Sequence, residues 1–149
     1  MNSQAIVGDL SNNYTFFFDA VRLLDGDETQ RWFYTTGLNG TNLQVYFISG
    51  GIDGRIRLFF RAAGGSSDSS ITWELGPQEG SRYKIAIVRS EGSLKFFADG
   101  SLIGENTNNV PDELTYYNVF AGNGAQQLNQ YAIFPTALTD SECIALTTL

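Results

Sequence analysis

The sequence predicts an all-β protein, an antiparallel β-sandwich with one short helix at its C-terminal end. Short runs rich in Phe, Tyr, Ile, Val and Thr recur along the chain. Clusters of Gly, Asp, Asn and Ser separate these runs at intervals of roughly 8–15 residues, which is typical of strands joined by short turns. Only the end of the chain carries the capping residues and apolar spacing of a helix.

Each predicted strand begins and ends where turn residues interrupt an apolar run. In the run 55–61, Ile56, Leu58 and Phe60 share one face, so this strand is buried on one side and faces water or a ligand on the other. Asp99-Gly100 separates two apolar runs and predicts a two-residue hairpin turn with both residues at positive φ. In chain order, the expected strands are 14–24, 30–37, 43–49, 55–62, 70–75, 82–89, 93–99, 101–105, 116–120 and 127–134.

The predicted helix follows Thr139. Thr139-Asp140-Ser141-Glu142 matches a capping box, in which Thr139 is the N-cap and Glu142 bonds back to it. Leu138 and Cys143 have the spacing of a hydrophobic staple across this cap. A helix of about two turns is unstable alone, so we expect it to dock on the sandwich.

Composition limits the chemistry. The chain has 149 residues, no His, one Cys and a net charge of −7. That length suits a single domain, 1–149. Without His there is no Ser-His-Asp machinery and no His-ligated zinc, and one Cys leaves no internal disulfide. The negative charge argues against nucleic acid as a partner, and the sequence contains neither an apolar run long enough to span a membrane nor a visible secretory signal.

Four segments of the C-terminal half resemble the laminin G-like, concanavalin A-like jelly rolls of bacterial and phage proteins. Residues 83–89 look like the family's aromatic-x-V-A-V strand, and 92–104 look like its L-x-L-Y-V-N-G-x-L-V-G hairpin. Residues 128–134 fall where the family often has I-D-E-V-R-I-Y, and 134–146 resemble its closing segment. Residues 14–21 resemble the opening strand without its Trp. The resemblance implies two stacked antiparallel sheets, a fold that hosts lectins, glucanases and capsid proteins alike.

A hydrolase or a calcium site would each need a particular set of acidic residues. The family's glucanases often carry an E-x-D-x-x-E strand, which this sequence lacks, so we expect no enzyme; Glu74 and Asp99 are the acids that a hydrolase would need. A structural calcium would use Asp25, Asp27 and Glu28, although a solvated hairpin turn is the preferred interpretation of that cluster. The family often has an acid where this chain has Asn129. We therefore predict no cofactor.

A sugar site is the third possibility. Aromatic planes bind the apolar face of a sugar, while Arg, Asn and Asp bind its hydroxyl and acidic groups. Arg55, Arg57 and Arg61 share one strand face in an acidic protein. The predicted ligand-binding residues, in a cleft for an acidic glycan, are Trp32, Tyr34, Tyr46, Arg57 and Arg61. Alternatively the aromatic residues, with Trp73, fill the core and the arginines pair with acids; Tyr116, Tyr117 and Asn118 offer a site at the rim.

These expectations lead to three hypotheses about function. The first is a non-enzymatic bacteriophage virion protein, a capsid decoration, fibre or tail-tip module that binds host-surface glycan or neighbouring virion subunits. It follows from the jelly-roll resemblance and from a chain that we expect to be complete without a secretory signal. The second is a carbohydrate-binding module of a larger bacterial protein, extracellular or at the cell surface. The third is a glucanase-like hydrolase. A homo-oligomer is compatible with each of them.

Overall fold

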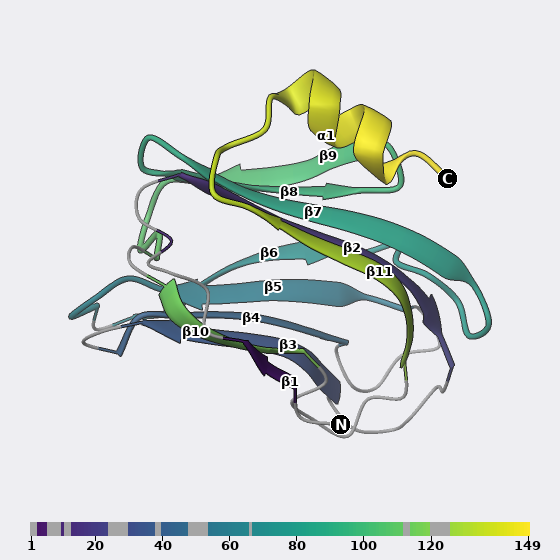
Figure 1. Ribbon diagram of the computed structural model, residues 1–149, viewed down its shortest axis with the longest axis horizontal. Helices are drawn as coiled ribbons and strands as arrows, with labels where there is room; N and C mark the ends of the chain where they lie inside the picture. The colour runs from purple at the N-terminus through teal and green to yellow at the C-terminus, as the bar shows by residue number, and fades with distance from the viewer. Residues whose placement is uncertain are drawn as a thin grey trace.

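The computed structural model describes residues 3–5, 10, 13–23, 30–37, 40–47, 54–65, 67–111, 114–119 and 126–149. They form two antiparallel sheets stacked face to face, with one helix on the outer side of one sheet (Figure 1). The predicted all-β sandwich with a C-terminal helix is confirmed. None of the helices in these ranges is long and apolar enough to cross a membrane.

The strands divide between a six-stranded and a five-stranded sheet. The first contains β1 (Ser3–Ala5), β3 (Gln30–Gly37), β4 (Asn42–Phe47), β5 (Ile56–Arg61), β6 (Ser69–Trp73) and β10 (Leu114–Val119), and the second contains β2 (Tyr14–Arg22), β7 (Arg82–Ser90), β8 (Ser93–Ala98), β9 (Ser101–Asn106) and β11 (Gln126–Phe134). Their spatial orders are β1-β10-β3-β4-β5-β6 and β11-β2-β7-β8-β9. All predicted strands lie within two residues of these limits.

Only β1 was missed by the sequence analysis. It is three residues long and has no apolar run, and it is a strand because it pairs with β10, from Ser3 opposite Val119 to Ala5 opposite Tyr117. Such a short edge strand is defined by its partner rather than by its own composition. Sequence periodicity could not have found it.

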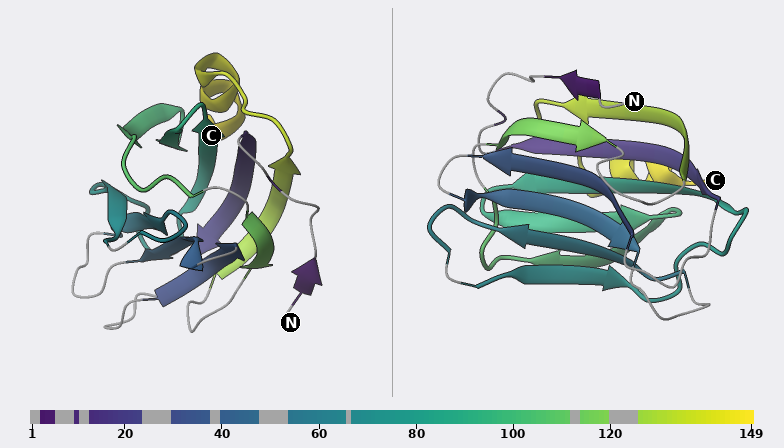
Figure 2. Two further views of the ribbon diagram at one scale, coloured as in Figure 1. Left: turned by 90° about the vertical axis from the view of Figure 1, so that its left-hand side faces the viewer. Right: turned by 90° about the horizontal axis from the view of Figure 1, so that it is seen from below.

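The main core fills the space between the two sheets, and period-two alternation explains its composition. On β5, Ile56, Leu58 and Phe60 are fully buried and the residues between them are half-buried, as the alternation predicted. Phe16 and Phe18 of β2 meet Phe33 of β3 from the opposite sheet, with ring centroids 5.1 and 4.8 Å from that of Phe33. Trp73 packs against this core, half-buried. The two views in Figure 2 show the sheets stacked around it.

A second, smaller apolar cluster lies on the other side of the five-stranded sheet. Ala86 and Val88 of β7 and Phe97 of β8 pack there against Cys143 of α1 (Asp140–Thr147). The predicted capping box is present: the Glu142 N–H donates to Thr139 Oγ1 (3.3 Å), and the Thr139 N–H donates to Glu142 Oε2 (2.8 Å). Leu138 packs into the same cluster, as the staple predicted. The helix therefore covers part of this sheet's outer surface.

Two hairpins in the five-stranded sheet have the same tight turn. Asp99 and Gly100 have φ values of 42° and 78°, which confirms the predicted turn, and Glu91 and Gly92 have 46° and 83° between β7 and β8. Positive φ at both central residues is the type I′ pattern, which matches the twist of a β-hairpin. Glu91 tolerates this conformation less well than Asn would.

We expect Glu91→Asn to stabilise the protein by about 0.5–1 kcal/mol, because Asn-Gly is the preferred pair for this turn. The midpoint of urea unfolding should rise. Glu79→Asn is the matched control, since Glu79 is exposed and does not have a positive φ. Equal shifts in both variants would show that the change in charge, and not the turn, is responsible.

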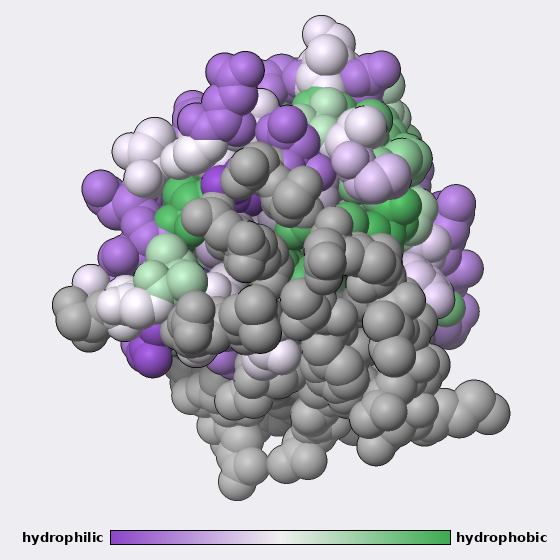
Figure 3. Space-filling view, turned by 60° about the vertical axis from the view of Figure 1, so that its left-hand side comes forward, coloured by the Kyte–Doolittle hydropathy of each residue, from purple (hydrophilic) through white to green (hydrophobic). Residues whose placement is uncertain are grey.

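Figure 3 shows one end of the sandwich, turned toward the viewer. Hydrophilic residues occupy much of the coloured surface, and hydrophobic residues gather mainly in its upper right part. No single kind of side chain dominates the visible part of the surface that is coloured. The polar features described below lie on the outer surfaces of the two sheets.

Candidate functional site

The six-stranded sheet has an outer face that points away from the core, seen from below in the right panel of Figure 2. On β5 this face carries Arg57, Phe59 and Arg61, all half-buried. The register places Arg57 between Tyr46 of β4 and Thr72 of β6, and Phe59 between Gln44 and Ser70. Polar positions and an aromatic side chain thus lie in adjacent rows across three strands.

Arg57 is a cation without an acceptor in the part of the chain that the structure describes. No hydrogen bond or ion pair joins it to another described residue, and its Nε is shielded from solvent with no hydrogen-bond partner. A buried polar group without a partner costs about 1–3 kcal/mol and calls for an explanation. Because the protein has a net charge of −7, a cation left without a carboxylate partner is notable.

Arg61 differs from Arg57. Its Nη2 lies 2.5 Å from Asp68 Oδ1, and its Nε donates to the same oxygen. The predicted alternative, in which the arginines of this face pair with acids, therefore holds for Arg61 but not for Arg57 in the described chain. A ligand at Arg61 would compete with Asp68.

The aromatic residues predicted for the site lie on the neighbouring strands. Tyr34 of β3 is in register with Gln44 of β4, and Tyr46 with Arg57. Trp32 falls at a register shift between Arg31, which pairs with Tyr46, and Phe33, which pairs with Val45. The backbone thus brings these strands together around β5, while the side chains of Trp32, Tyr34 and Tyr46 lie outside the described part of the structure, as do those of Tyr116, Tyr117 and Asn118.

A pocket of ≈ 370 Å³ adjoins this face where β5 begins and β6 ends, and sequence analysis did not predict it. Arg55 Nη1 lies 3.8 Å from Glu74 Oε2, and Arg55 Nε is buried without an acceptor in the described chain. The pocket is lined by Arg55, Glu74, Leu75, Gly76 and Gln78. The alternation Arg55-x-Arg57 predicted that Arg55 shares the face of Arg57, but the segment 74–78 contains no apolar run that would place it.

Close backbone packing holds the segment that contains Gly76, one of the residues that line this pocket. A Cβ on Gly76 would lie 2.0 Å from the Gly54 carbonyl oxygen, and a Cβ on Gly54 would lie 2.1 Å from that of Pro77. From β2 in the other sheet, the buried side chain of Arg22 donates through Nη1 to the Pro77 carbonyl (2.9 Å). Gly54, Gly76 and Arg22 therefore fix the segment that faces Arg55.

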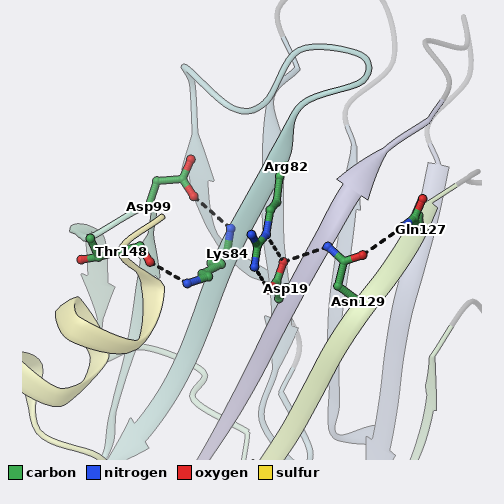
Figure 4. Close-up of polar contacts among 7 residues, drawn as sticks. All are labelled: Asp19, Arg82, Lys84, Asp99, Gln127, Asn129 and Thr148. Atoms are coloured by element: carbon green, nitrogen blue, oxygen red, sulfur yellow. Dashed lines mark hydrogen bonds and ion pairs between the residues drawn. The ribbon is translucent and has the colours of Figure 1, made fainter.

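A second polar cluster lies on the outer surface of the five-stranded sheet (Figure 4). Arg82 donates from Nε to Asp19 Oδ1 (2.8 Å) and from Nη2 to Oδ2 (2.5 Å), which is a bidentate pair. Asn129, at a register shift in β11, donates to Asp19 Oδ1 (3.1 Å) and accepts from Gln127 (3.0 Å). Arg82, and next Asn129, lower the pKa of Asp19 against the opposing effect of burial. The cluster is internally satisfied and therefore structural.

The acids considered for metal binding or hydrolysis do not form a site in the described chain. Asp25, Asp27 and Glu28 lie outside the described residues, and within these no group of three or more metal-type side chains occurs. The Asn129 carbonyl, the position considered in the family comparison, accepts from Gln127. Glu74 lies beside Arg55 near β6, whereas Asp99 follows β8 in the other sheet and accepts the Lys84 N–H (2.9 Å).

No protein-family model and no curated protein sequence matches the chain. Many solved structures do, with low sequence identity. The carbohydrate-binding module of a Ruminococcus gnavus sialidase, bound to α2,3-sialyllactose, has a TM-score of 0.74 and 12% identity, covering 100% of this chain and 98% of that one. A heptameric pentraxin from Limulus polyphemus has a TM-score of 0.70 and 16% identity, and the match covers 97% of this chain and 74% of that one. A Caenorhabditis elegans galectin has a TM-score of 0.64 and 13% identity, and the match covers 90% of this chain and 91% of that one.

These similarities concern the fold. At 12–16% identity they show which architecture the chain has, and they transfer no ligand to it. The two stacked antiparallel sheets agree with these similarities, which cover 90% or more of this chain. The chain has the jelly-roll β-sandwich of concanavalin A-like lectins and carbohydrate-binding modules.

Proposed function

We propose that this chain is a non-enzymatic glycan-binding module whose ligand lies on the outer face of the six-stranded sheet, around Arg57. The observation that carries the proposal is the guanidinium of Arg57, which is held in the middle strands without an acceptor among the described residues. A carboxylate on a sugar would supply that acceptor. Arginine suits the role because its planar fork forms paired hydrogen bonds with carboxylates.

The neighbours of Arg57 suit a sugar better than a simple ion. Phe59 offers an apolar surface two residues along β5, and sugars expose apolar C–H faces beside their hydroxyl groups. Thr72 and Ser70 of β6 carry hydroxyl groups in register with Arg57 and Phe59, and Gln44 of β4 carries an amide. A cation, an aromatic surface and several neutral hydrogen-bonding groups are the components that a carboxylated sugar requires.

The solved structures support this proposal in a general way. They include a carbohydrate-binding module with bound sialyllactose and a galectin, so the fold is one that binds glycans elsewhere. The virion role predicted from the sequence rests on the family resemblance and on the absence of a visible secretory signal, and none of the structures named above is a virion protein. We therefore propose the alternative setting, a carbohydrate-binding module of an extracellular or cell-surface protein.

The test compares a charged and a neutral sugar. α2,3-Sialyllactose carries one carboxylate and lactose carries none, and we expect the first to bind at least about tenfold more tightly, because a hydrogen bond to a charged group contributes about 1.5–3 kcal/mol. Arg57→Gln should lower the affinity for sialyllactose to that for lactose. Calorimetric titration measures both affinities.

The control for charge is Lys95→Gln. Lys95 lies on β8 in the other sheet and pairs with Asp140 of α1, so this variant also removes one cation but leaves the proposed site intact. It should bind sialyllactose like the unmodified protein. Equal affinities for the two sugars, or equal losses in the two variants, would contradict the proposal.

A further inference from the structure

We infer that the pocket beside Arg55 is a second anion subsite of the same face, so that the protein selects glycans with two neighbouring acidic sugars over glycans with one. This inference rests on the proposed function. It assigns Arg57 to one acidic group and Arg55 to the next. The ligand class is therefore a polyanionic glycan rather than a glycan with a single charge.

The first argument is the placement of the two arginines. Arg55 directly precedes β5 and Arg57 lies within it, so the two arginines are two residues apart and their backbones lie within about 7 Å of each other. Each has an Nε that is shielded from solvent and lacks an acceptor in the described chain. Shielding at Nε shows that both side chains are packed at the base of their guanidinium groups. Two cations are thus held close together at the start of β5.

The second argument is the weakness of the one ion pair at Arg55. Its distance to Glu74, 3.8 Å, is near the upper limit for an ion pair, and the Glu74 side chain is 67% exposed. Exposed ion pairs of this kind contribute about 0–1 kcal/mol, so the contact costs little to replace. By comparison, Arg61 lies 2.5 Å from Asp68. A second carboxylate on a ligand could take the place of Glu74 with little loss.

The third argument is the pocket itself. Its volume of ≈ 370 Å³ lies in the range of small-molecule sites. Leu75 is 87% exposed at its lining, the most exposed of the large hydrophobic residues in the described chain, and it offers an apolar contact beside the cation. Gln78 adds an amide for hydroxyl groups. Because Gly54 and Arg22 hold the segment 76–77, this side of the pocket is ordered before a ligand binds.

The experiment measures how much a second charge adds. The probes are α2,3-sialyllactose, with one carboxylate, and a disialylated lactose, with two consecutive carboxylated sugars. In the unmodified protein we expect the second sugar to raise the affinity about tenfold. Arg55→Gln should reduce the ratio of the two affinities to about one. Glu74→Gln should raise the ratio, because it removes the carboxylate that competes for Arg55.

Opposite effects at two residues of one pocket are the pattern that a structural role would not produce. Thermal unfolding of each variant shows that the fold is retained, and Lys95→Gln again serves as the control for charge. If sialyllactose binds but the second sugar adds nothing, or if Arg55→Gln weakens both probes equally, the second subsite is wrong and the proposed function stands. If neither probe binds, both are wrong.

Discussion

Replacing Gly54 by alanine should lower the free energy of unfolding by about 2–5 kcal/mol. Two separate costs add up at this position. Gly54 has a φ of +61°, a conformation that costs a residue with a Cβ about 1–2 kcal/mol. The new Cβ would also lie 2.1 Å from the Pro77 carbonyl oxygen, and overpacking of this kind typically costs about 1–3 kcal/mol.

Two further glycines separate the costs. Gly64 has nearly the same φ, +66°, and nothing lies within 4 Å of its added Cβ, so Gly64→Ala should cost about 1–2 kcal/mol from backbone strain alone. At Gly76 no positive φ is present, but the added Cβ would lie 2.0 Å from the Gly54 carbonyl oxygen, so Gly76→Ala measures the clash alone. Urea unfolding at neutral pH gives all three values.

The three values also test the description of the pocket. If Gly54→Ala costs no more than Gly64→Ala, the backbone segments 54 and 76–77 are not in tight contact, and the segment beside the pocket is not held as described. If Gly76→Ala is as costly as the clash requires, the segment that faces Arg55 is held by backbone contacts and not only by Arg22. That result would support the preformed subsite independently of any binding measurement.

The fold was predictable because local signals agreed with the tertiary arrangement. Strict alternation in 55–61 determined which side of β5 is buried, and the Asp99-Gly100 pair determined a hairpin turn. The capping box at Thr139 determined where the helix begins. In each case a few adjacent residues carry the whole signal. β1 carries no such local signal and is a strand only through its pairing with β10, and it was not predicted.

The site was less predictable, because its contacts join residues that are distant in sequence. Alternation placed Arg57 on the face of β5 that points away from the core, but whether an acid lies nearby depends on strands that are remote in sequence. Arg61 pairs with Asp68, seven residues away across the turn to β6, whereas the Nε of Arg57 has no hydrogen-bond partner in the described chain. The pair of Asp19 and Arg82 joins residues 63 positions apart. No local pattern specifies such a contact.

The network around Asp19 should make stability depend on pH. The Asp19 side chain is only 5% exposed, and Arg82 donates two hydrogen bonds to its carboxylate. Arg82→Ala would leave this buried charge with Asn129 as its remaining side-chain donor among the described residues. We expect Arg82→Ala to lower the free energy of unfolding at pH 7, because a buried carboxylate that loses its donors is destabilising. Asp19→Asn should cost less, because Arg82 is more than half exposed and can be hydrated.

The sign of the pH dependence follows from the lowered pKa of Asp19. Hydrogen bonds from Arg82, and next from Asn129, stabilise the ionised form in the folded protein, so its pKa there lies below the ordinary value of 3.8. The folded state is therefore favoured above that ordinary value, and this advantage is lost as the pH falls through the lowered pKa. The stability difference between the unmodified protein and Asp19→Asn should be constant from about pH 7 to pH 5 and shrink below about pH 4. Urea unfolding at about pH 7, 5 and 3, two values above that ordinary pKa and one below it, measures this difference in stability. A difference that is the same at all three would mean that Arg82 does not stabilise the ionised carboxylate, and that the bidentate pair contributes only packing.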